Sequence, residues 1–454
     1  MQDTSGLTPS STPVRYFEEN GKTFIPIGLN LCFPRFISNE QEGLDLYAQW
    51  IKRLADAGGN YMRLWLGHAF FDLEPEQAGV FCPRVASRLD RVLKMAHERG
   101  IRVKLTLDHF RSISTQAQAE IFPGAASFDK PVYAKANGGC AEDMDAFLTH
   151  PDGQALYLKK LDWLSERYAE HPAIFGWELW NEMNSVNSSH WPQWTRLMLP
   201  ELRKRFPRHR VMQSLGSFDR ESQNALYADY ATMRPMDLVQ VHRYLDPAAG
   251  FTQCQGPADL MCADAVNTLR EMAPDLPVIL AETGAVEANH SAPAKLYASD
   301  TEGLLLHDLI FAPFFSGSAG CGQMWHWDYY VTKHNLWWHY GRFARAIEGF
   351  NPAGDGPVHT SVWETDDLRA YGLSGRCQSL IWLRDTSSDW RSEIIDGQPA
   401  PLRQPSTFAL PDSLPRTQTI TCYDPWEDRE TVAERTAEGV QLPAFRRSLV
   451  LRLK

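Results

Sequence analysis

The strongest constraint on the fold of this chain is a regular alternation of short apolar runs with longer amphipathic stretches, from about residue 20 to about residue 350. The runs have the length of buried strands, and the stretches carry apolar residues at helical spacing. Strands are expected at 24–30, 61–66, 101–107, 173–180, 211–215, 238–242, 278–282 and 322–325. Helices are expected at 44–57, 85–99, 154–168, 194–206, 259–272, 303–311 and 337–350. Eight strands alternating with helices over about 330 residues are typical of an α/β fold of the (β/α)8, or TIM, barrel type with insertions.

A doubly wound parallel sheet is the alternative architecture. Its dinucleotide-binding form needs a GxGxxG turn after the first strand, and none follows residue 30. The longest stretch without a predicted element is 108–150, directly after the third strand. A loop of that length is usually either functional or disordered.

The alternation ends at the Gly- and Pro-rich segment 351–357, which indicates a domain boundary. Short strand-like runs follow, separated by turn residues, at 368–373, 379–384, 417–423, 439–442 and 448–453. This pattern predicts a small all-β sandwich. The expected organisation is a polar N-terminal tail (1–19), a catalytic barrel (20–352) and a β-sandwich accessory domain (358–454).

The charge balance and the aromatic content narrow the classes of ligand. Forty-five basic against 56 acidic side chains give a net charge of −11, which disfavours a nucleic-acid partner. No run of about 18 apolar residues is present, so a membrane-spanning helix is not expected. The chain holds 15 Trp, 15 Tyr and 22 Phe. These aromatic residues fit either large cores or a site that stacks on flat apolar faces such as those of sugars.

Eight cysteines are too few for a disulfide scaffold, and none has the CxxC spacing of a zinc site. Cys254 with Cys262, and Cys377 with Cys422, could each form a disulfide in an oxidising compartment. The polar Ser-, Thr- and Pro-rich start fits a cytosolic protein or a mature secreted one. A secreted or periplasmic location with the signal removed is favoured over a cytoplasmic one.

Two carboxylates stand out because each ends a predicted strand. Glu182 follows the fourth strand, and Glu282 closes the seventh. A single glutamate at a strand end is more often a cap or an ion pair, but strands four and seven face each other across a barrel whose site lies at these ends. Two facing carboxyl groups can cleave a glycosidic bond, with retention at a separation of about 5–5.5 Å and inversion at about 6.5–9.5 Å. The neighbouring Asn181 could donate to a sugar hydroxyl.

Together these motifs resemble clan A retaining glycoside hydrolases, most closely glycoside hydrolase family 5. The resemblance covers roughly residues 20–350 and rests on the Asn-Glu pair, the distant second Glu, and a set of strand-end residues: Arg63, His242 and Tyr244 of a His-x-Tyr, and Trp325. It implies that Glu182 is the acid/base and Glu282 the nucleophile. It also implies a trailing β-sandwich, an oligosaccharide or polysaccharide substrate, and no cofactor.

Each implied role has a physical reason. Arg63 and the hydroxyl of Tyr244 would hold the negative charge of Glu282. An apolar wall and the charged Glu282 would raise the pKa of Glu182 and keep it protonated. His242 could bond either carboxylate or the sugar, although a buried structural histidine is the alternative.

Further substrate contacts are predicted at lower specificity. Trp325 would form the floor under a sugar ring, and Trp327 shares its strand parity. Strand ends also supply Asn30, His109 and Asp328 as possible sugar contacts, each of which could equally serve the backbone. Glu178 is expected deeper in the barrel, paired with Arg63.

Two rival functions remain open from the sequence. A metal-dependent hydrolase would need His-x-His at the first strand, where Leu29-Asn30-Leu31 stands, although His68, His109, His242 and His326 end other strands. A non-catalytic sugar-binding barrel would not need two carboxylates. Within the enzyme interpretation, the long 108–150 loop favours exo-action or short oligosaccharides over an endo-acting β-glucanase or β-mannanase. The oligomeric state is not predicted. The C-terminal domain is expected to support packing, with Trp390 and Trp426 as its candidates for sugar contact.

Overall fold

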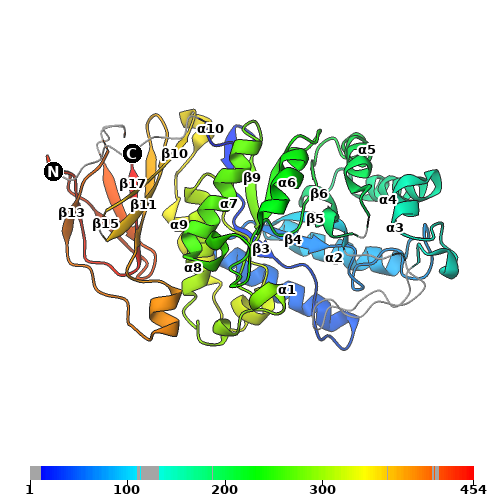
Figure 1. Cartoon of the computed structure of the whole chain (residues 1–454), viewed down its shortest axis with the longest axis horizontal. Helices are drawn as coiled ribbons and strands as arrows, with labels where there is room; N and C mark the ends of the chain where they lie inside the picture. The colour runs from blue at the N-terminus through cyan, green and yellow to red at the C-terminus, as the bar shows by residue number, and fades with distance from the viewer. Residues whose placement is uncertain are drawn as a thin grey trace.

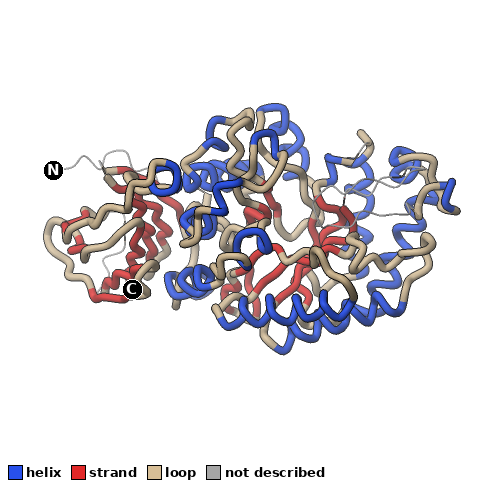
Figure 2. The backbone as a smooth tube through the Cα atoms, turned by 90° about the horizontal axis from the view of Figure 1, so that it is seen from below, coloured by secondary structure: helices blue, strands red, loops and turns tan. Residues whose placement is uncertain are grey.

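The computed structural model describes residues 12–109, 113, 132–186, 188–365, 367–411, 414 and 419–454. A helix-wrapped barrel lies beside a C-terminal antiparallel sheet, drawn in orange to red in Figure 1; Figure 2 shows the barrel strands enclosed by helices. The parallel strands are β3 (Gly28–Asn30), β4 (Tyr61–Trp65), β5 (Arg102–His109), β6 (Ile174–Asn181), β7 (Arg210–Met212), β8 (Val239–His242) and β9 (Val278–Glu282). The predicted (β/α)8 barrel is confirmed.

The helices follow the predicted positions and begin with local capping signals. They are α1 (Glu40–Asp56), α2 (Pro83–Glu98), α3 (Met144–Thr149), α4 (Pro151–Tyr168), α5 (Trp191–Arg205), α6 (Asn224–Ala231), α7 (Ala258–Met272), α8 (Leu304–Phe315), α9 (Trp338–Ala346) and α10 (Pro352–Asp355). Asn39 caps α1 by accepting the N–H of Glu42, and α2, α4 and α5 carry Pro in the first turn. The sequence analysis did not predict α3, α6 or α10.

The barrel closes through an irregular eighth segment. The predicted strand 322–325 is not a regular strand, because the N–H of Gly322 donates to the Ile310 carbonyl of α8 (3.3 Å) and not to a neighbouring strand. Closure still occurs on both sides of it: Asn30 N–H donates to Met324 O (3.1 Å), and Gln323 N–H donates to Leu280 O (3.0 Å). The first, seventh and eighth positions therefore meet at one seam.

The C-terminal region forms a six-stranded antiparallel sheet in the order β10-β11-β12-β17-β14-β15, with a separate β13-β16 pair. Its strands are β10 (His359–Glu364), β11 (Leu368–Ser374), β12 (Ser379–Asp385), β13 (Ser406–Phe408), β14 (Ile420–Asp424), β15 (Arg429–Val432), β16 (Val440–Leu442) and β17 (Ser448–Leu453). These strands fit the predicted sandwich; β10, β13 and β15 were not predicted, and residues 417 and 418 of the predicted strand 417–423 lie outside the described residues.

Alternate residues of this sheet belong to two different cores. On β12, Leu380 and Trp382 join the large barrel core, whereas Ile381 and Leu383 join a smaller C-terminal core. This is the period-two pattern of a strand that is buried on both faces. One face of the sheet therefore continues the barrel core.

Buried ion pairs cross the contact between sheet and barrel. Arg384 donates two hydrogen bonds to Asp308 of α8 (2.8 and 2.9 Å), and Arg369 forms an ion pair with Asp259 of α7 at 2.6 Å. Trp426 donates its indole N–H to Ser448 (3.2 Å) and packs on the ring of His307 of α8. Trp390 also packs, partly buried, against the barrel core. These contacts support a packing role for the C-terminal domain.

Several other predictions concern the remaining parts of the chain. The end of the predicted polar tail (1–19) forms β1 (Phe17–Glu19), which pairs with β2 (Lys22–Phe24) beyond the tail; residues 1–11 lie outside the described residues. About half of the predicted loop 108–150 also lies outside them, at 110–112 and 114–131. All eight cysteines are free, so neither candidate disulfide, Cys254–Cys262 or Cys377–Cys422, is formed. Within the described part of the chain, none of the helices combines the length and apolarity that a bilayer crossing requires.

Candidate active site

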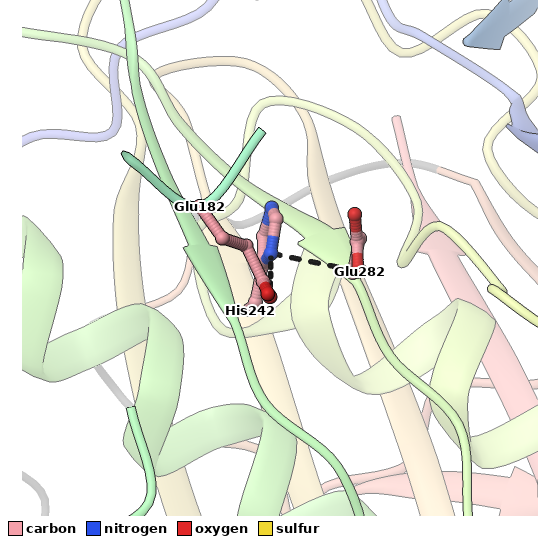
Figure 3. Close-up of side chains that lie close together, drawn as sticks. All are labelled: Glu182, His242 and Glu282. Atoms are coloured by element: carbon pink, nitrogen blue, oxygen red, sulfur yellow. Dashed lines mark hydrogen bonds and ion pairs between the residues drawn. The ribbon is translucent and has the colours of Figure 1, made fainter. Parts of the chain in front are cut away.

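Glu182 and Glu282 come from opposite strands and converge at the carboxyl ends of the barrel (Figure 3). Glu282 is the last residue of β9, and Glu182 directly follows β6. Glu182 adopts left-handed backbone angles (φ 49°, ψ 55°), and its N–H donates to the hydroxyl of Ser214 at 2.9 Å. A left-handed non-glycine residue costs on the order of 1–3 kcal/mol, and such residues concentrate at functional sites. This turn aims the carboxyl group across the barrel mouth.

The two carboxyl groups are close enough to act on one anomeric carbon. His242 lies between them, with Nδ1 at 2.8 Å from Glu182 Oε1 and 3.5 Å from Glu282 Oε2 (Figure 3). One oxygen of each glutamate and one nitrogen of His242 all lie within 4.8 Å of one another. An approach of these two oxygens to within 4.8 Å fits the shorter carboxyl separation of retaining glycosidases better than the longer one of inverting enzymes.

Glu282 is held by two further donors. Arg63 makes an ion pair with Glu282 Oε1, and the Tyr244 hydroxyl donates to Oε2 at 2.8 Å. Burial raises the pKa of Glu282, while Arg63 and Tyr244 act in the opposite direction. Tyr244, in turn, keeps its proton, because burial and the two neighbouring glutamates raise its pKa well above the usual range.

Glu182 lacks these compensating partners. Burial and the charge of Glu282 raise the pKa of Glu182 well above its usual range. Of the pair, Glu282 is therefore the group that ionises first. Burial, followed by the positive charge of Arg63, lowers the pKa of His242 well below its ordinary value, so the ring between the glutamates is neutral.

Beneath the pair lies a buried charge cluster around Glu178. Arg63 donates to both Glu178 oxygens (2.8 and 3.0 Å), and Lys104 and Thr106 contact Oε2 at 3.1 and 2.9 Å. Despite burial, the charges of Arg63 and Lys104 lower the pKa of Glu178 to about 2. Burial lowers the pKa of Lys104 to about 8. Glu178 thus holds Arg63 in the orientation in which it meets Glu282.

Two of the predicted sugar-binding amides serve the protein itself. Asn30 donates to the carbonyls of Ala281 (3.0 Å) and Gln323 (3.1 Å), and its Oδ1 accepts from Arg63 at 3.4 Å. Asn181 Oδ1 accepts from Arg63 at 2.7 Å. The NH2 group of Asn30 satisfies backbone carbonyls at the barrel seam, because buried carbonyls need donors. Asn30 therefore connects the seam to Arg63 and does not reach into the pocket.

Of the predicted aromatic and strand-end sugar contacts, some line the pocket and others do not. Trp325 lines a pocket together with Glu182, whereas Trp327 is fully buried and packs edge-on against Phe33. His109 is buried with its ring tilted against Trp65. Asp328 forms a 2.5 Å ion pair with Arg35 and accepts the N–H of Tyr329. Trp327, His109 and Asp328 do not line the pocket.

The pocket has a volume of about 410 Å³ and includes residues that the sequence analysis missed. These lie after the first, fifth, seventh and eighth strand positions; they include Arg35, Asp219, Arg220, His290 and Tyr329. His326, which the sequence analysis named only for the metal-dependent alternative, also lines the pocket. Placement after a strand end was the available signal, but it does not distinguish them from other loop residues.

Glu182, His242 and Glu282 also have the donor types of a metal site. The guanidinium of Arg63 already occupies Glu282 and opposes a second cation beside it. A raised pKa at Glu182 likewise favours a proton over a metal there. The trio is better suited to proton transfer than to metal binding.

No family model matches the chain. It is 26% identical to the mannan endo-1,4-β-mannosidase A of Podospora anserina over 181 residues, which cover 37% of this chain and less than half (42%) of that relative. It superposes on the endo-β-1,4-mannanase of Thermotoga petrophila with a TM-score of 0.53 and 17% identity, covering 94% of this chain and 92% of the other. For the endo-1,4-β-mannanase of Rhizomucor miehei the TM-score is 0.52 at 17% identity, with 75% and 99% covered. The resemblance to glycoside hydrolases drawn from the sequence is confirmed in fold.

Proposed function

We propose that this chain is a retaining glycoside hydrolase that cleaves β-linked glycosides by double displacement. The observation that carries the proposal is that one carboxyl oxygen of Glu182 and one of Glu282 lie within 4.8 Å of each other; Glu282 is bonded by Arg63 and Tyr244, and Glu182 has neither partner. Such a pair suits a nucleophile and an acid at a single bond. No cofactor is needed for this chemistry.

In the first step, ionised Glu282 attacks the anomeric carbon, and the bond from that carbon to the leaving oxygen breaks. Protonated Glu182 gives its proton to this oxygen, so the leaving sugar departs as a neutral alcohol. In the second step, Glu182 takes a proton from water, and the resulting nucleophile displaces Glu282 from the sugar. The enzyme regains its starting protonation, and two inversions give net retention.

The substrate class is proposed from the relatives. Those compared above carry mannanase or mannosidase names, which supports β-1,4-linked mannose saccharides as the substrate. We favour short oligosaccharides or exo-action, since segments after five strand positions line a pocket of about 410 Å³. Endo-action on mannan is the second candidate, because these relatives are named as endo-acting. A secreted or periplasmic location remains a prediction.

The test is a substrate panel with the wild type, Glu182→Gln and Glu282→Ala. The panel holds aryl β-glycosides and oligosaccharides of β-1,4-linked mannose, glucose and xylose. We expect turnover of mannosides, a fall of about 10²–10⁴-fold for Glu182→Gln on oligosaccharides, and a smaller fall on aryl glycosides whose leaving group needs no proton. Glu282→Ala should lose turnover altogether. The exposed Glu221→Gln is the matched control and should retain activity.

Two readouts decide the finer points. Proton NMR of the first product should show the β-anomer, and an inverted product would refute the double displacement. Early release of monosaccharide, or of one short unit, fits exo-action, whereas a ladder of long fragments fits the endo-acting candidate. Sugar binding without turnover by the wild type on the whole panel would refute the enzyme proposal.

A further inference from the structure

A buried carboxylate ties the loop after β8 to the loop after β9. Asp246 Oδ1 accepts the N–H groups of Ala248 (2.8 Å) and Asn289 (3.1 Å), and Oδ2 accepts the N–H of His290 (3.0 Å). Asp246 is buried, although it lies outside the charge cluster around Glu178. A buried charge of this kind is stable only when donors satisfy it, and here backbone amides do so.

The loop that Asp246 holds is strained. Asn289 and His290 are consecutive non-glycine residues with positive φ, 59° and 57°. Each such residue costs roughly 1–2 kcal/mol, with asparagine tolerating it best. Their successive N–H groups converge on one anion, a backbone arrangement that favours negative charge. The carboxylate therefore stabilises a backbone shape that the chain would not adopt by itself.

The backbone conformation of Asn289 and His290 determines where the His290 side chain lies. His290 lines the same pocket as Glu182 and Trp325. It packs edge-on against Tyr244, with centroids 4.5 Å apart and planes at 75°. Tyr244 donates to Glu282, the proposed nucleophile. The ring of Tyr244 therefore lies between His290 and Glu282.

We propose that His290 contacts the sugar in this pocket and that Asp246 is the positioning residue that holds it there. This inference deepens the proposed function and rests on it. Burial lowers the pKa of His290, so its neutral ring offers one donor and one acceptor. That pairing suits neutral sugar hydroxyl groups rather than an anionic ligand.

A mutant cycle of His290→Ala, Asp246→Ala and the double variant tests both roles. One hydrogen bond between neutral groups corresponds to a rise in KM of about 2- to 12-fold, and we expect this for each single variant with kcat little changed. Because Asp246 acts through His290, the double variant should match His290→Ala rather than show the product of both effects. A multiplicative double variant, or an unchanged KM in His290→Ala, would overturn the inference.

Asp355→Ala is the matched control. The Asp355 carboxylate is also buried and also accepts two consecutive backbone amides, those of Cys377 (2.8 Å) and Gln378 (3.2 Å). This variant should lose stability but keep its KM. Should Asp246→Ala not fold, Asp246→Asn is measured alone and with Asn289→Gly. Glycine removes the backbone strain, so it should reduce the effect of Asp246→Asn; an undiminished effect would contradict the positioning role.

A binding measurement separates this inference from the proposed function. Calorimetric titration of β-1,4-mannotriose into the Glu282→Ala protein requires no turnover. His290→Ala in that background should weaken binding by about 2- to 12-fold, and unchanged affinity would refute the inference. Intact binding with an inactive wild type would refute the proposed function alone. Absence of any binding would refute both.

Discussion

Replacing Glu178 by glutamine removes the negative charge that holds Arg63 and Lys104 inside the barrel. The carboxylate accepts two hydrogen bonds from Arg63, one from Thr106, and lies 3.1 Å from Lys104. The glutamine NH2 would face these donors instead. Arg63 would retain its ion pair with Glu282, and Lys104 would lose its contact with a carboxylate.

The size of the effect follows from the pKa of Glu178. Its ordinary value is 4.5, and its value in the fold is about 2. The difference, at ~1.36 kcal/mol per pKa unit, corresponds to about 3 kcal/mol of stability. Because the folded-state pKa is depressed, this stability is present above pH 4.5 and is lost as the pH falls through about 2. Removing one partner of a buried pair typically costs about 3–5 kcal/mol, which agrees in size.

The assay is urea unfolding of the wild type and Glu178→Gln at a series of pH values from about 7 down to about 3. At pH 7 the variant should be less stable by about 3 kcal/mol, and the gap should narrow steadily below pH 4.5. Glu201→Gln, which breaks a half-exposed pair with Arg205 on α5, is the control and should change stability by under about 0.5 kcal/mol. A gap below about 1 kcal/mol at pH 7, or one that does not change with pH, would refute the reasoning.

Four further outcomes are expected. The kcat/KM profile should be bell-shaped: activity falls at low pH as Glu282 takes up a proton, and at high pH as Glu182 loses one, the latter limb shifted upward by its raised pKa. Glu182→Gln should remove the alkaline limb, and a limb that persists would contradict the assignment. Tyr244→Phe removes a 2.8 Å bond to the nucleophile, so steady-state kinetics should show kcat/KM about 10- to 100-fold lower and an acid limb at higher pH. Asp308→Ala leaves Arg384 buried and unpaired; calorimetry should show a loss of about 3–5 kcal/mol with KM unchanged, and a shifted KM would argue for a role in the site. Dialysis against a strong chelator should leave activity intact, and loss restored by a divalent metal would favour the metal-dependent alternative.

The convergence of Glu182 and Glu282 could be predicted from the sequence because barrel geometry fixes where strand ends lie. Once Glu182 and Glu282 end strands four and seven, their convergence follows from the fold. That inference needs only the strand order, which short apolar runs reveal. Arg63 and Tyr244 were predicted beside Glu282 from the resemblance to glycoside hydrolase family 5, and the structure places both against Glu282.

Predictions that assumed extended chain beyond a strand end were less successful. The parity argument placed Trp325 and Trp327 on the same side, but the backbone turns at His326 and continues as a π-helix over 327–332. Trp327 therefore enters the core while Trp325 stays at the pocket. The link from Asp246 to His290 could not be predicted either, because it joins two loops 44 positions apart in sequence.

Asn30 links the closure of the barrel to the proposed nucleophile. Its NH2 group donates to carbonyls at the seventh and eighth strand positions, while its oxygen accepts from Arg63, the partner of Glu282. A substitution of Asn30 made to raise thermal stability should therefore also change the activity. In directed evolution for thermal stability, we expect position 30 to stay unchanged and stabilising substitutions to accumulate in the outer helices and the C-terminal sheet.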